Sequence, residues 1–321
     1  MEDSIFNSFK KEVSGLQKNV LLAKHTTFNI GGPARYFLEA SQKKEIVTAL
    51  RFCKKNHIPF FILGGGSNLL VSDDGFSGLV IKRKDKNITL KSAFIIQADG
   101  GVVLGDLVEF SINKSLSGLE WAGGLPGTFG GAVRGNAGCF GSETKDNILE
   151  VEALDHNFNL KKLKNQDCRF SYRTSIFKKK NWQVLSATLK FSKGDKQKLQ
   201  EIVNSYIQYR KDKQPLDSPN AGSIFKNCDL NLFSTKWQEK LNFVVKKDPF
   251  PVVPTAYLIS EAGLKGVKIG DAQVSEKHPN FIINLGNAKA QDVLTLVDLV
   301  KDKVKKMYSV SLEMEVQYLG K

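Results

Sequence analysis

The sequence predicts a fold that mixes helices with strands and divides into more than one domain. The chain has 321 residues, and a domain usually takes about 100–200, so we expect two or three. Some segments repeat apolar residues at three and four positions, as helices do, and others carry short apolar runs or strict alternation, as strands do. Hydrophobic residues make up 41% of the chain and charged residues 25%, which is typical of a globular protein and excludes a disordered or collagen-like one.

The first part of the chain has a β/α pattern. Residues 43–56 place apolar side chains at helical spacing, and residues 59–63 and 79–81 are short apolar runs that predict strands. A glycine cluster at 64–68 directly follows the first of these strands. The inward side of the helix is predicted to carry Ile46, Ala49, Leu50 and Cys53.

Strand-like runs dominate the middle of the chain, at 88–90, 93–98, 148–154 and 182–191. A helix near 103–118 interrupts them, with Val103 expected on its apolar side, and a more polar helix is predicted over 196–211. The second helix is expected to face the core with Leu199, Ile202, Val203, Tyr206 and Tyr209.

The last third of the chain predicts a short helix at 256–262 that ends at Gly263, a strand at 281–284 and a long helix at 288–306. In the long helix an aspartate stands early and lysines stand late, which suits the helix dipole. The final segment alternates and predicts a half-buried strand, with Glu313 and Glu315 on its polar side. Its buried side is predicted to hold Val310, Leu312, Met314, Val316 and Tyr318.

The formal net charge of +14, from 47 Lys and Arg against 33 Asp and Glu, leaves nucleic acid, a membrane surface and small anions open as partners. Because the lysines are scattered, we expect most of the surplus to be solvated surface. No stretch approaches the about 18 uncharged apolar residues of a transmembrane helix, and residues 1–17 lack an apolar signal region. The 4 cysteines and 4 histidines stand far apart, without metal-ligand spacing. The sequence therefore predicts a cytoplasmic protein without a metal site.

Two segments, residues 64–68 and 123–138, are too rich in glycine to be ordinary turns. Glycine lets the backbone approach a ligand closely and take positive φ, so that successive N–H groups can converge on phosphate oxygens. Ser67, Asn68, Thr128 and Asn136 add neutral donors that suit a pyrophosphate or a ribose. The alternative is two flexible loops that need glycine only for turn geometry. Neither segment is GxGxxG or GxxxxGK[ST], which argues against a Rossmann domain and a P-loop NTPase.

A series of motifs runs in order along the chain. They are TTFNIGGPA (26–34), LGGGSNL (63–69), GLEWAGGLPGTFGGA (118–132), FSYRTSIFK (170–178), NAGSIFKN (220–227), AGLKG (262–266), HPNFIIN (278–284) and EVQYLG (315–320). With these motifs the chain resembles the UDP-N-acetylenolpyruvoylglucosamine reductases of peptidoglycan synthesis, usually called MurB. GGGSN alone would indicate only the flavoprotein superfamily that includes vanillyl-alcohol oxidase, whereas the ordered set is specific.

The resemblance implies an α+β, three-domain flavoprotein, with an FAD-binding domain of the vanillyl-alcohol oxidase/MurB type and a C-terminal α/β substrate domain. The FAD-binding subdomains would span 1–82, to which a C-terminal strand at 309–321 returns, and 83–213. The substrate domain would span 214–308.

The implied activity is the reduction of UDP-N-acetylglucosamine enolpyruvate to UDP-N-acetylmuramate with NADPH. Non-covalent FAD would take a hydride from NADPH and pass it from the flavin N5 to the vinyl carbon. Charge then develops on the neighbouring carbon and its carboxylate. Such a site needs a cation for the carboxylate and a proton donor for the carbon.

Three residues stand at the family's catalytic positions. Arg173 would hold the carboxylate, because a guanidinium stays charged and fits it bidentately; otherwise it is a surface arginine. Ser223 would donate the proton; outside the motif, a serine in this setting is a turn or helix-cap residue. Glu315 would polarise the carboxylate or relay a proton; the alternative is a solvated carboxylate, as expected for Glu313.

The resemblance also implies binding residues. The flavin would be bound by Gly64, Gly65, Gly66, Ser67, Asn68, Leu69, Gly123, Gly124, Pro126, Gly127, Thr128, Gly130, Gly131, Ala132, Asn136 and Gly138. The substrate would be bound by Arg210, Lys213, Asn220, Lys226 and Asn227. The short span between the arginine motif and NAGSIFKN indicates the subtype without the tyrosine loop. We expect a monomer, with no nucleic-acid partner and no insertion into a membrane.

Two other functions remain open. An FAD oxidase of the same superfamily, acting on an alcohol or sugar, would carry similar glycine loops. No histidine stands in 64–74 or 123–138 for covalent flavin attachment, and Cys139 is the only nearby thiol. A basic nucleic-acid-binding protein would agree with the charge, but the sequence has no RNP, zinc-finger or clear helix-turn-helix pattern.

Overall fold

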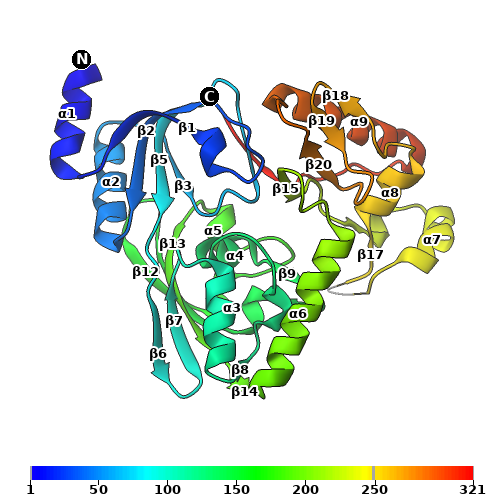
Figure 1. Ribbon diagram of the computed structural model, residues 1–321, viewed down its shortest axis with the longest axis horizontal. Coiled ribbons are helices and arrows are strands. Elements are labelled where there is room, and N and C mark those ends of the chain that lie inside the picture. Colours follow the sequence, from blue (N-terminus) through cyan, green and yellow to red (C-terminus); the bar gives the residue numbers. More distant parts are fainter. Residues whose placement is uncertain (1, 248–249, 321) are drawn as a thin grey trace. The chain divides into compact units, whose positions relative to one another are not determined.

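The computed structural model describes residues 2–247 and 250–320, which fall into two units (Figure 1). Unit 1 combines Met1–Val20, Ala34–Gly65 and Phe76–Gln208, and unit 2 combines Leu21–Pro33, Gly66–Gly75 and Tyr209–Lys321. Each unit therefore joins segments that are far apart in the sequence. The boundary between Gly65 and Gly66 lies inside the first glycine segment.

The first sheet of unit 1 pairs its inner strands in parallel. In order across the sheet, its strands are β1 (Gln17–Leu21), β2 (Pro33–Ala40), β5 (Phe76–Arg83) and β3 (Phe60–Leu63). The helices α1 (Glu2–Glu12) and α2 (Lys43–Lys55) share its core, and α2 begins at a capping box in which Glu45 accepts from the N–H of Gln42. The helix predicted over 43–56 and the strands predicted over 59–63 and 79–81 are confirmed, and the four predicted inward residues of α2 are fully buried.

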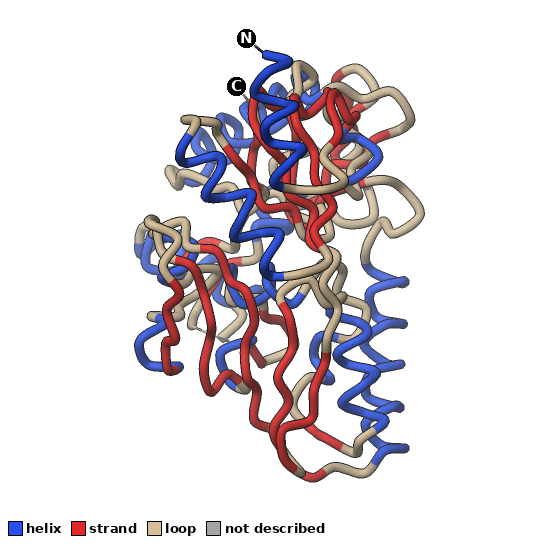
Figure 2. The backbone as a smooth tube through the Cα atoms, turned by 90° about the vertical axis from the view of Figure 1, so that its left-hand side faces the viewer, coloured by secondary structure: helices blue, strands red, loops and turns tan. Residues whose placement is uncertain are grey.

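The second sheet of unit 1 is antiparallel, and Figure 2 shows its strands side by side. Across the sheet these are β12 (Leu160–Lys164), β11 (Ile148–Leu154), β13 (Gln183–Lys190), β7 (Ile95–Asp99) and β6 (Ile88–Ser92). Side chains from α3 (Leu104–Asn113), α4 (Phe129–Gly135) and α5 (Ile176–Lys179) form one core with this sheet. The four predicted strands are confirmed, but β12 was not predicted. Its LKKLK sequence is mostly exposed at the sheet edge, so it lacks the apolar pattern of a covered strand.

Two predictions about helix faces in this region are wrong. Val103 precedes α3 as its N-cap and is 51% exposed, because the helix starts one residue later. In α6 (Lys196–Lys213), Leu199 and Val203 are buried as predicted, but Ile202 and Tyr209 are 41% and 48% exposed. Leu199 and Val203 are four positions apart and define a narrow buried stripe, and Ile202 lies outside it.

Unit 2 has a four-stranded antiparallel sheet and two main helices. The sheet order is β15 (Asn220–Ser223), β20 (Phe281–Asn284), β19 (Ala272–Val274) and β18 (Lys268–Ile269). The helix α8 (Thr255–Glu261) ends at Gly263, whose φ of +68° suits glycine, and α9 (Ala290–Tyr308) buries its apolar stripe. The N-terminus of α9 is capped by Asp73, whose carboxylate accepts from the N–H groups of Ala290 and Gln291 at 2.9 and 3.3 Å. The helices predicted at 256–262 and 288–306 and the strand at 281–284 are confirmed.

The C-terminal segment differs from its prediction. Only β21 (Gln317–Leu319) forms a strand, parallel to β4 (Leu69–Val71), and upstream of it a single bridge joins Met314 to Phe225. Val310, Leu312 and Val316 are buried as predicted, but Tyr318 is 50% exposed and Leu319 is buried instead. The alternation changes face because the segment pairs with β4 only at its end.

The remaining elements are short. They are the strand pairs β8 (Leu116–Ser117) with β14 (Ser192–Lys193), β9 (Gly138–Cys139) with β10 (Ser142–Glu143) and β16 (Cys228–Asp229) with β17 (Val252–Val253), and the helix α7 (Thr235–Leu241). The described residues also form 3₁₀ turns, at Leu22–His25, Glu120–Ala122, Thr144–Asp146, Asn165–Cys168, Leu230–Leu232 and Asn242–Val244.

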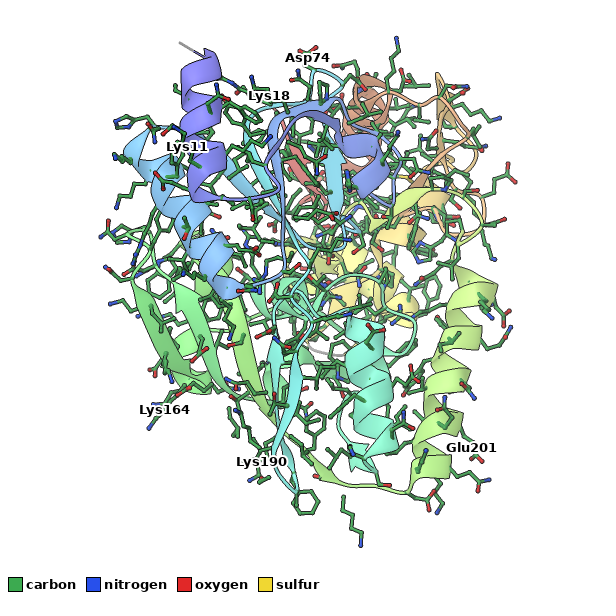
Figure 3. All side chains as sticks on the ribbon, turned by 60° about the vertical axis from the view of Figure 1, so that its left-hand side comes forward. Lys11, Lys18, Asp74, Lys164, Lys190 and Glu201 are labelled. Carbon is green, nitrogen blue, oxygen red and sulfur yellow. The ribbon has the colours of Figure 1, made fainter. Side chains whose placement is uncertain are left out.

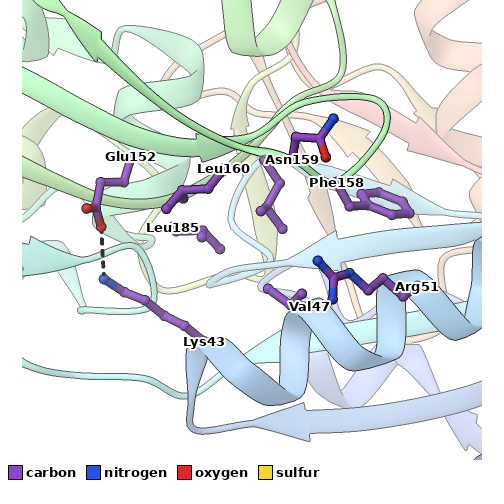
Figure 4. Close-up of a pocket in the computed structure, with 9 residues that line it drawn as sticks. Lys43, Val47, Arg51, Glu152, Phe158, Asn159, Leu160 and Leu185 are labelled. Atoms are coloured by element: carbon purple, nitrogen blue, oxygen red, sulfur yellow. Dashed lines mark hydrogen bonds and ion pairs between the residues drawn. The ribbon is translucent and has the colours of Figure 1, made fainter.

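A cavity of about 350 Å³ lies in unit 1 between α2 and the strands β11 and β13 (Figure 4). At one end Lys43 bridges Glu152 and Asp99 at 3.4 and 3.2 Å, and Ser186 donates to Glu152 at 2.7 Å. Burial by itself raises the pKa of Glu152, but hydrogen bonds from Ser186 and Lys162 and the charge of Lys43 outweigh it, so the pKa lies below its ordinary value. The cavity is lined by none of the predicted site residues, and its paired charges link α2 to the second sheet.

The lysines labelled in Figure 3, namely Lys11, Lys18, Lys164 and Lys190, are all exposed. The expectation that most of the surplus charge is solvated surface is met at these four lysines. Within the described ranges, none of the helices combines the length and the apolar character needed to cross a membrane.

Candidate active site

The first glycine segment forms a loop between β3 and β4. Within the part of the chain that the structure describes, none of the five N–H groups from Gly64 to Asn68 donates to a protein acceptor. Gly66 has a φ of +66°, and a Cβ there would lie 2.3 Å from the carbonyl oxygen of His25, so only glycine fits. The loop therefore presents a row of unpaired backbone donors, which is the arrangement that binds an anion.

The second glycine segment lies directly against the first within unit 1. A Cβ on Gly64 would lie 2.3 Å from Oγ1 of Thr128, and a Cβ on Gly65 would lie 2.7 Å from the Cα of Gly127. At Gly65, therefore, no side chain larger than hydrogen fits against the backbone of Gly127. The structure thus brings together two segments that the sequence separates by some sixty positions, as 64–65 and 127–128.

Some of the other predicted flavin residues lie in the elements that follow the two glycine segments along the chain. Gly130 follows Phe129 at the start of α4, and its N–H donates to the carbonyl of Gly100 at 2.8 Å. Ala132 is 6% exposed in the same helix, and Leu69 is 4% exposed at the start of β4. Gly123 is buried in a turn, whereas Gly124 and Pro126 are exposed in the same loop. Gly131 is exposed within α4, and Gly138 is half-buried in β9.

Asn136 is the predicted flavin residue whose placement is most informative. Its side chain is fully buried at the C-terminus of α4, with a φ of +45°. The amide Nδ2 donates to Oε2 of Glu143 at 3.0 Å and to the carbonyl of Ser171 at 3.1 Å, and Oδ1 accepts from the N–H of Lys145 at 3.0 Å. Its polar atoms are thus engaged within the protein.

Arg173 lies in a tight turn closed by reciprocal backbone hydrogen bonds between Ser171 and Thr174 at 3.1 and 3.0 Å. Its guanidinium Nη2 donates to the carbonyl of Gly138 at 2.8 Å and stacks over the ring of Tyr172 at 4.9 Å. The residue is half-buried, and its φ of +54° is unusual for a residue with a side chain. A half-buried arginine held at its head and at its backbone is presented as a fixed cation.

Ser223 ends β15 in unit 2 and is half-buried. The preceding turn is held by Asn220, whose Oδ1 accepts from the N–H of Gly222 at 2.9 Å and whose Nδ2 donates to the carbonyls of Pro215 and Ser218 at 3.1 and 2.8 Å. Gly222 has a φ of +79°, which lets the strand present Ser223 after the turn.

Glu315 lies on the backbone segment beside that strand. Its N–H donates to the carbonyl of Ile224 at 2.8 Å, and its carbonyl accepts from Nδ2 of Asn68 at 3.2 Å. The structure therefore places Ser223, Glu315 and the end of the first glycine loop on adjoining backbone within unit 2. Arg173 belongs to unit 1.

The predicted substrate residues are placed in different ways. Lys226 forms an ion pair with Glu313, Asn227 accepts through Oδ1 from the N–H of Thr255 at 3.2 Å, and Arg210 is 5% exposed near the end of α6. Lys213 is exposed. The side chain of Glu313 is 71% exposed, as expected, but it also forms the ion pair with Lys226.

One residue that supports the site was missed by the sequence analysis. Thr27 donates through Oγ1 to the carbonyl of Asn220 at 2.7 Å, and its N–H donates to the carbonyl of Gly66 at 3.2 Å. It thereby links the first glycine loop to the serine turn inside unit 2. The motif TTFNIGGPA was the available signal, but a motif does not say which carbonyl a threonine will meet.

No metal centre is evident among the residues described: no group of three or more His, Cys, Asp or Glu there could hold a metal ion. The four cysteines are free thiols. Burial raises the pKa of Cys53 to about 12, so this thiol stays protonated at neutral pH.

Comparison with known proteins agrees with these features. Residues 34–163 match the family model "FAD binding domain", and residues 214–319 match "UDP-N-acetylenolpyruvoylglucosamine reductase, C-terminal domain". A UDP-N-acetylenolpyruvoylglucosamine reductase from Caldanaerobacter subterraneus subsp. tengcongensis is 40% identical over 306 residues, which cover 95% of this chain and 94% of that protein. The chain belongs to the UDP-N-acetylenolpyruvoylglucosamine reductase family.

Two further members of this family are similar to the chain over nearly its whole length. A reductase of the same name from Clostridium botulinum (strain Alaska E43 / Type E3) is 37% identical, with 98% of this chain and 96% of that protein covered. The crystal structure of the reductase (MurB) from Thermus caldophilus superposes with a TM-score of 0.75 at 30% identity, covering 95% of this chain and 99% of the other. The predicted α+β fold, with an FAD-binding domain and a C-terminal domain of the MurB family, is therefore confirmed.

Proposed function

We propose that this protein is an FAD-dependent reductase that converts UDP-N-acetylglucosamine enolpyruvate to UDP-N-acetylmuramate, with NADPH as the hydride donor, in peptidoglycan precursor synthesis. The observation that carries the proposal is the similarity to reductases of this family over 95% and 98% of the chain. The glycine loops and the NAGSIFKN segment are both retained within that span.

The glycine loops fit a flavin dinucleotide. Five successive N–H groups, from Gly64 to Asn68, have no protein acceptor among the described residues, and a pyrophosphate would supply acceptors for such a row. Gly127 and Thr128 would close the other side, since they contact Gly64 and Gly65. When bound, FAD supplies the hydride-transfer chemistry, and the residues of the chain bind, orient and neutralise.

The three predicted catalytic residues would bind the carboxylate, donate the proton and assist one of these two steps. Arg173 would bind the enolpyruvyl carboxylate and stabilise its negative charge as the neighbouring carbon gains electrons. Ser223 would donate the proton from Oγ to that carbon. Glu315, beside the Ser223 strand, would polarise the carboxylate or relay the proton that Ser223 gives up.

The basic residues suit the substrate's diphosphate. Lys226 has a side chain only 15% exposed and is paired with the exposed carboxylate of Glu313. Arg210, Lys213 and Asn227 would complete the binding set. Asn220 is bonded within its own turn and would act by fixing Ser223.

The arrangement of domains in this proposal follows the sequence. FAD-binding subdomains would span 1–82 and 83–213, with 309–321 returning to the first, and the substrate domain would span 214–308. We further propose that the protein acts as a monomer in the cytoplasm, where its nucleotide substrates are soluble.

Two measurements together test the proposed function: the bound cofactor of the purified protein and its oxidation of NADPH. Purified protein is expected to be yellow, with flavin absorption near about 450 nm, to release its flavin on acid precipitation, and to oxidise NADPH only when the enolpyruvyl substrate is present. Oxidation of an alcohol or sugar by oxygen, without NADPH, would identify the oxidase alternative. A colourless protein that FAD cannot reconstitute would contradict both.

Gly65→Ala is expected to weaken FAD binding. The added Cβ meets the Cα of Gly127 at 2.7 Å, so the two loops must separate at a cost of about 1–3 kcal/mol, which is roughly a 5- to 150-fold rise in Kd. Fluorescence titration of the apoprotein with FAD measures the change. Gly105→Ala in α3 is the matched control, because its Cβ meets nothing within 4 Å. Equal FAD affinity in the two variants would show that the loops do not need their close approach.

A further inference from the structure

We propose that Glu143 is a positioning residue for Arg173, because its side chain packs on Gly138, whose carbonyl accepts from the guanidinium, and accepts from Asn136, which holds the turn that contains Arg173. The proposal rests on the role given above to Arg173. Glu143 belongs to none of the predicted sites, and every residue involved lies in unit 1. The contacts form two separate connections that meet at the arginine.

The first connection runs through the paired strands β9 and β10. Glu143 lies opposite Gly138 in this pair, and the carbonyl of Gly138 accepts from Nη2 of Arg173 at 2.8 Å. A Cβ built on Gly138 would lie 2.7 Å from Cγ of Glu143. The Glu143 side chain therefore packs directly on the residue that holds the guanidinium.

The second connection runs through the buried amide of Asn136. Oε2 of Glu143 accepts from Nδ2 of Asn136 at 3.0 Å, and the same nitrogen donates to the carbonyl of Ser171 at 3.1 Å. Ser171 and Thr174 close the turn that contains Arg173. The carboxylate of Glu143 thus orients the amide that holds the first residue of the arginine turn.

The backbone of Arg173 shows that the turn is imposed by its surroundings. Its φ of +54° lies in the left-handed region, which a residue with a side chain adopts only where the surrounding structure determines it. Lys178 adds a further hold by donating from Nζ to the Arg173 carbonyl at 3.0 Å. A fixed arginine loses less entropy when it binds a carboxylate than a mobile one does.

Glu143 also caps the 3₁₀ turn at Thr144–Asp146, where its N–H donates to Oδ2 of Asp146 at 2.7 Å. The residue is 8% exposed, and its Oε2 pairs with Asn136 and with Nζ of Lys145 at 2.8 Å. Its other oxygen, Oε1, is buried and has no hydrogen-bond partner among the residues the structure describes. A buried acceptor without a partner destabilises a fold, so this oxygen is not accounted for by the cap or by the pairs with Asn136 and Lys145.

The test uses Glu143→Leu and Glu143→Gln in the holoenzyme. Leucine keeps the bulk but removes both oxygens, so reduction of the enolpyruvyl group is expected to fall about 10- to 10²-fold, as when a catalytic group shifts by about 1 Å. Calorimetric titration of the oxidised holoenzyme with substrate is expected to show weaker binding, while flavin reduction by NADPH is unchanged. Glutamine keeps an acceptor for Asn136 and loses only an ion pair with the partly exposed Lys145, so its rate is expected to stay within about fivefold of the native rate.

A double-mutant cycle separates positioning from a general structural role. If Glu143 acts through Arg173, adding Glu143→Leu to Arg173→Met costs nothing further, because the group it positions is already gone. Asp155→Asn is the control, since Asp155 is a carboxylate of unit 1 that is 6% exposed and accepts from the N–H groups of Asn157 and Asn159. This control is expected to leave the second half-reaction, the reduction of the enolpyruvyl group by the reduced flavin, unchanged. Additive losses in the cycle, or an equal loss in both half-reactions of Glu143→Leu, would overturn the proposal.

The outcomes also separate this proposal from the function on which it rests. If Arg173→Met alone leaves enolpyruvyl reduction unchanged, the role assigned to Arg173 is wrong and the positioning proposal falls with it. If Arg173→Met is slow but Glu143→Leu has the native rate and substrate affinity, only the positioning proposal is wrong.

Discussion

Ser223→Ala is expected to leave the reduction of bound FAD by NADPH intact and to slow the reduction of the enolpyruvyl group by at least about 10²-fold, the low end for a general acid. A proton donor is needed only in the second half-reaction, so the two halves respond differently. Ser223 sits in β15, where its backbone pairs with Phe281, and alanine can take that backbone conformation. Stopped-flow absorbance of the flavin, followed separately in each half-reaction, measures both rates.

Ser205→Ala provides the control for removing a hydroxyl. Ser205 lies in α6 and donates to the carbonyl of Ile202 in its own helix, at 2.7 Å. Both half-reactions of this variant are expected to keep native rates. If Ser223→Ala slows flavin reduction as much as enolpyruvyl reduction, Ser223 supports folding or FAD binding and is not the proton donor.

Arg83→Met is expected to lower the free energy of unfolding by about 3–5 kcal/mol, because it leaves a buried carboxylate without its cation. Arg83 and Asp85 are 5% and 2% exposed, and Nε of the arginine donates to Oδ1 of the aspartate at 2.6 Å. The guanidinium also donates to the carbonyls of Val184 and Leu185 at 2.7 and 2.9 Å. It therefore joins the end of β5 to β13. The neighbouring Gly100 accepts, through its carbonyl, the hydrogen bond from the N–H of Gly130 in α4.

Urea unfolding followed by circular dichroism measures this loss, with two comparison variants. Arg51→Met removes an exposed arginine from α2 and is expected to change stability by no more than about 0.5 kcal/mol. The double variant Arg83→Met with Asp85→Leu removes both charges and is expected to recover most of the loss, since a buried pair replaced by apolar residues is often neutral. If the urea midpoint of Arg83→Met equals that of Arg51→Met, the Arg83–Asp85 pair does not stabilise the fold as expected.

The long helices were predicted from sequence because their patterns are local. In α9 the residues Val293, Leu296, Val297, Val300 and Val304 recur with the helical period, and all are buried. The edge strand β12 escaped prediction because lysines cover it on both faces. The faces of α6 and of the C-terminal segment were partly wrong, since which side is covered depends on what packs there. Ile202 and Tyr318 are apolar residues for which the fold provides no covering element.

The sequence by itself determined the family of this protein and the identities of the residues proposed for its chemistry, because each motif is a continuous string. Three contacts were decided by the tertiary structure alone. Gly65 lies against Gly127, the backbone N–H of Glu315 donates to Ile224 just after the Ser223 strand, and the amide of Asn136 donates to Glu143 and Ser171. The physical reason is that these contacts join backbone donors and acceptors from distant parts of the chain. No local pattern specifies such a partner, so Glu143 could be recognised only once the carbonyl groups around Arg173 were placed.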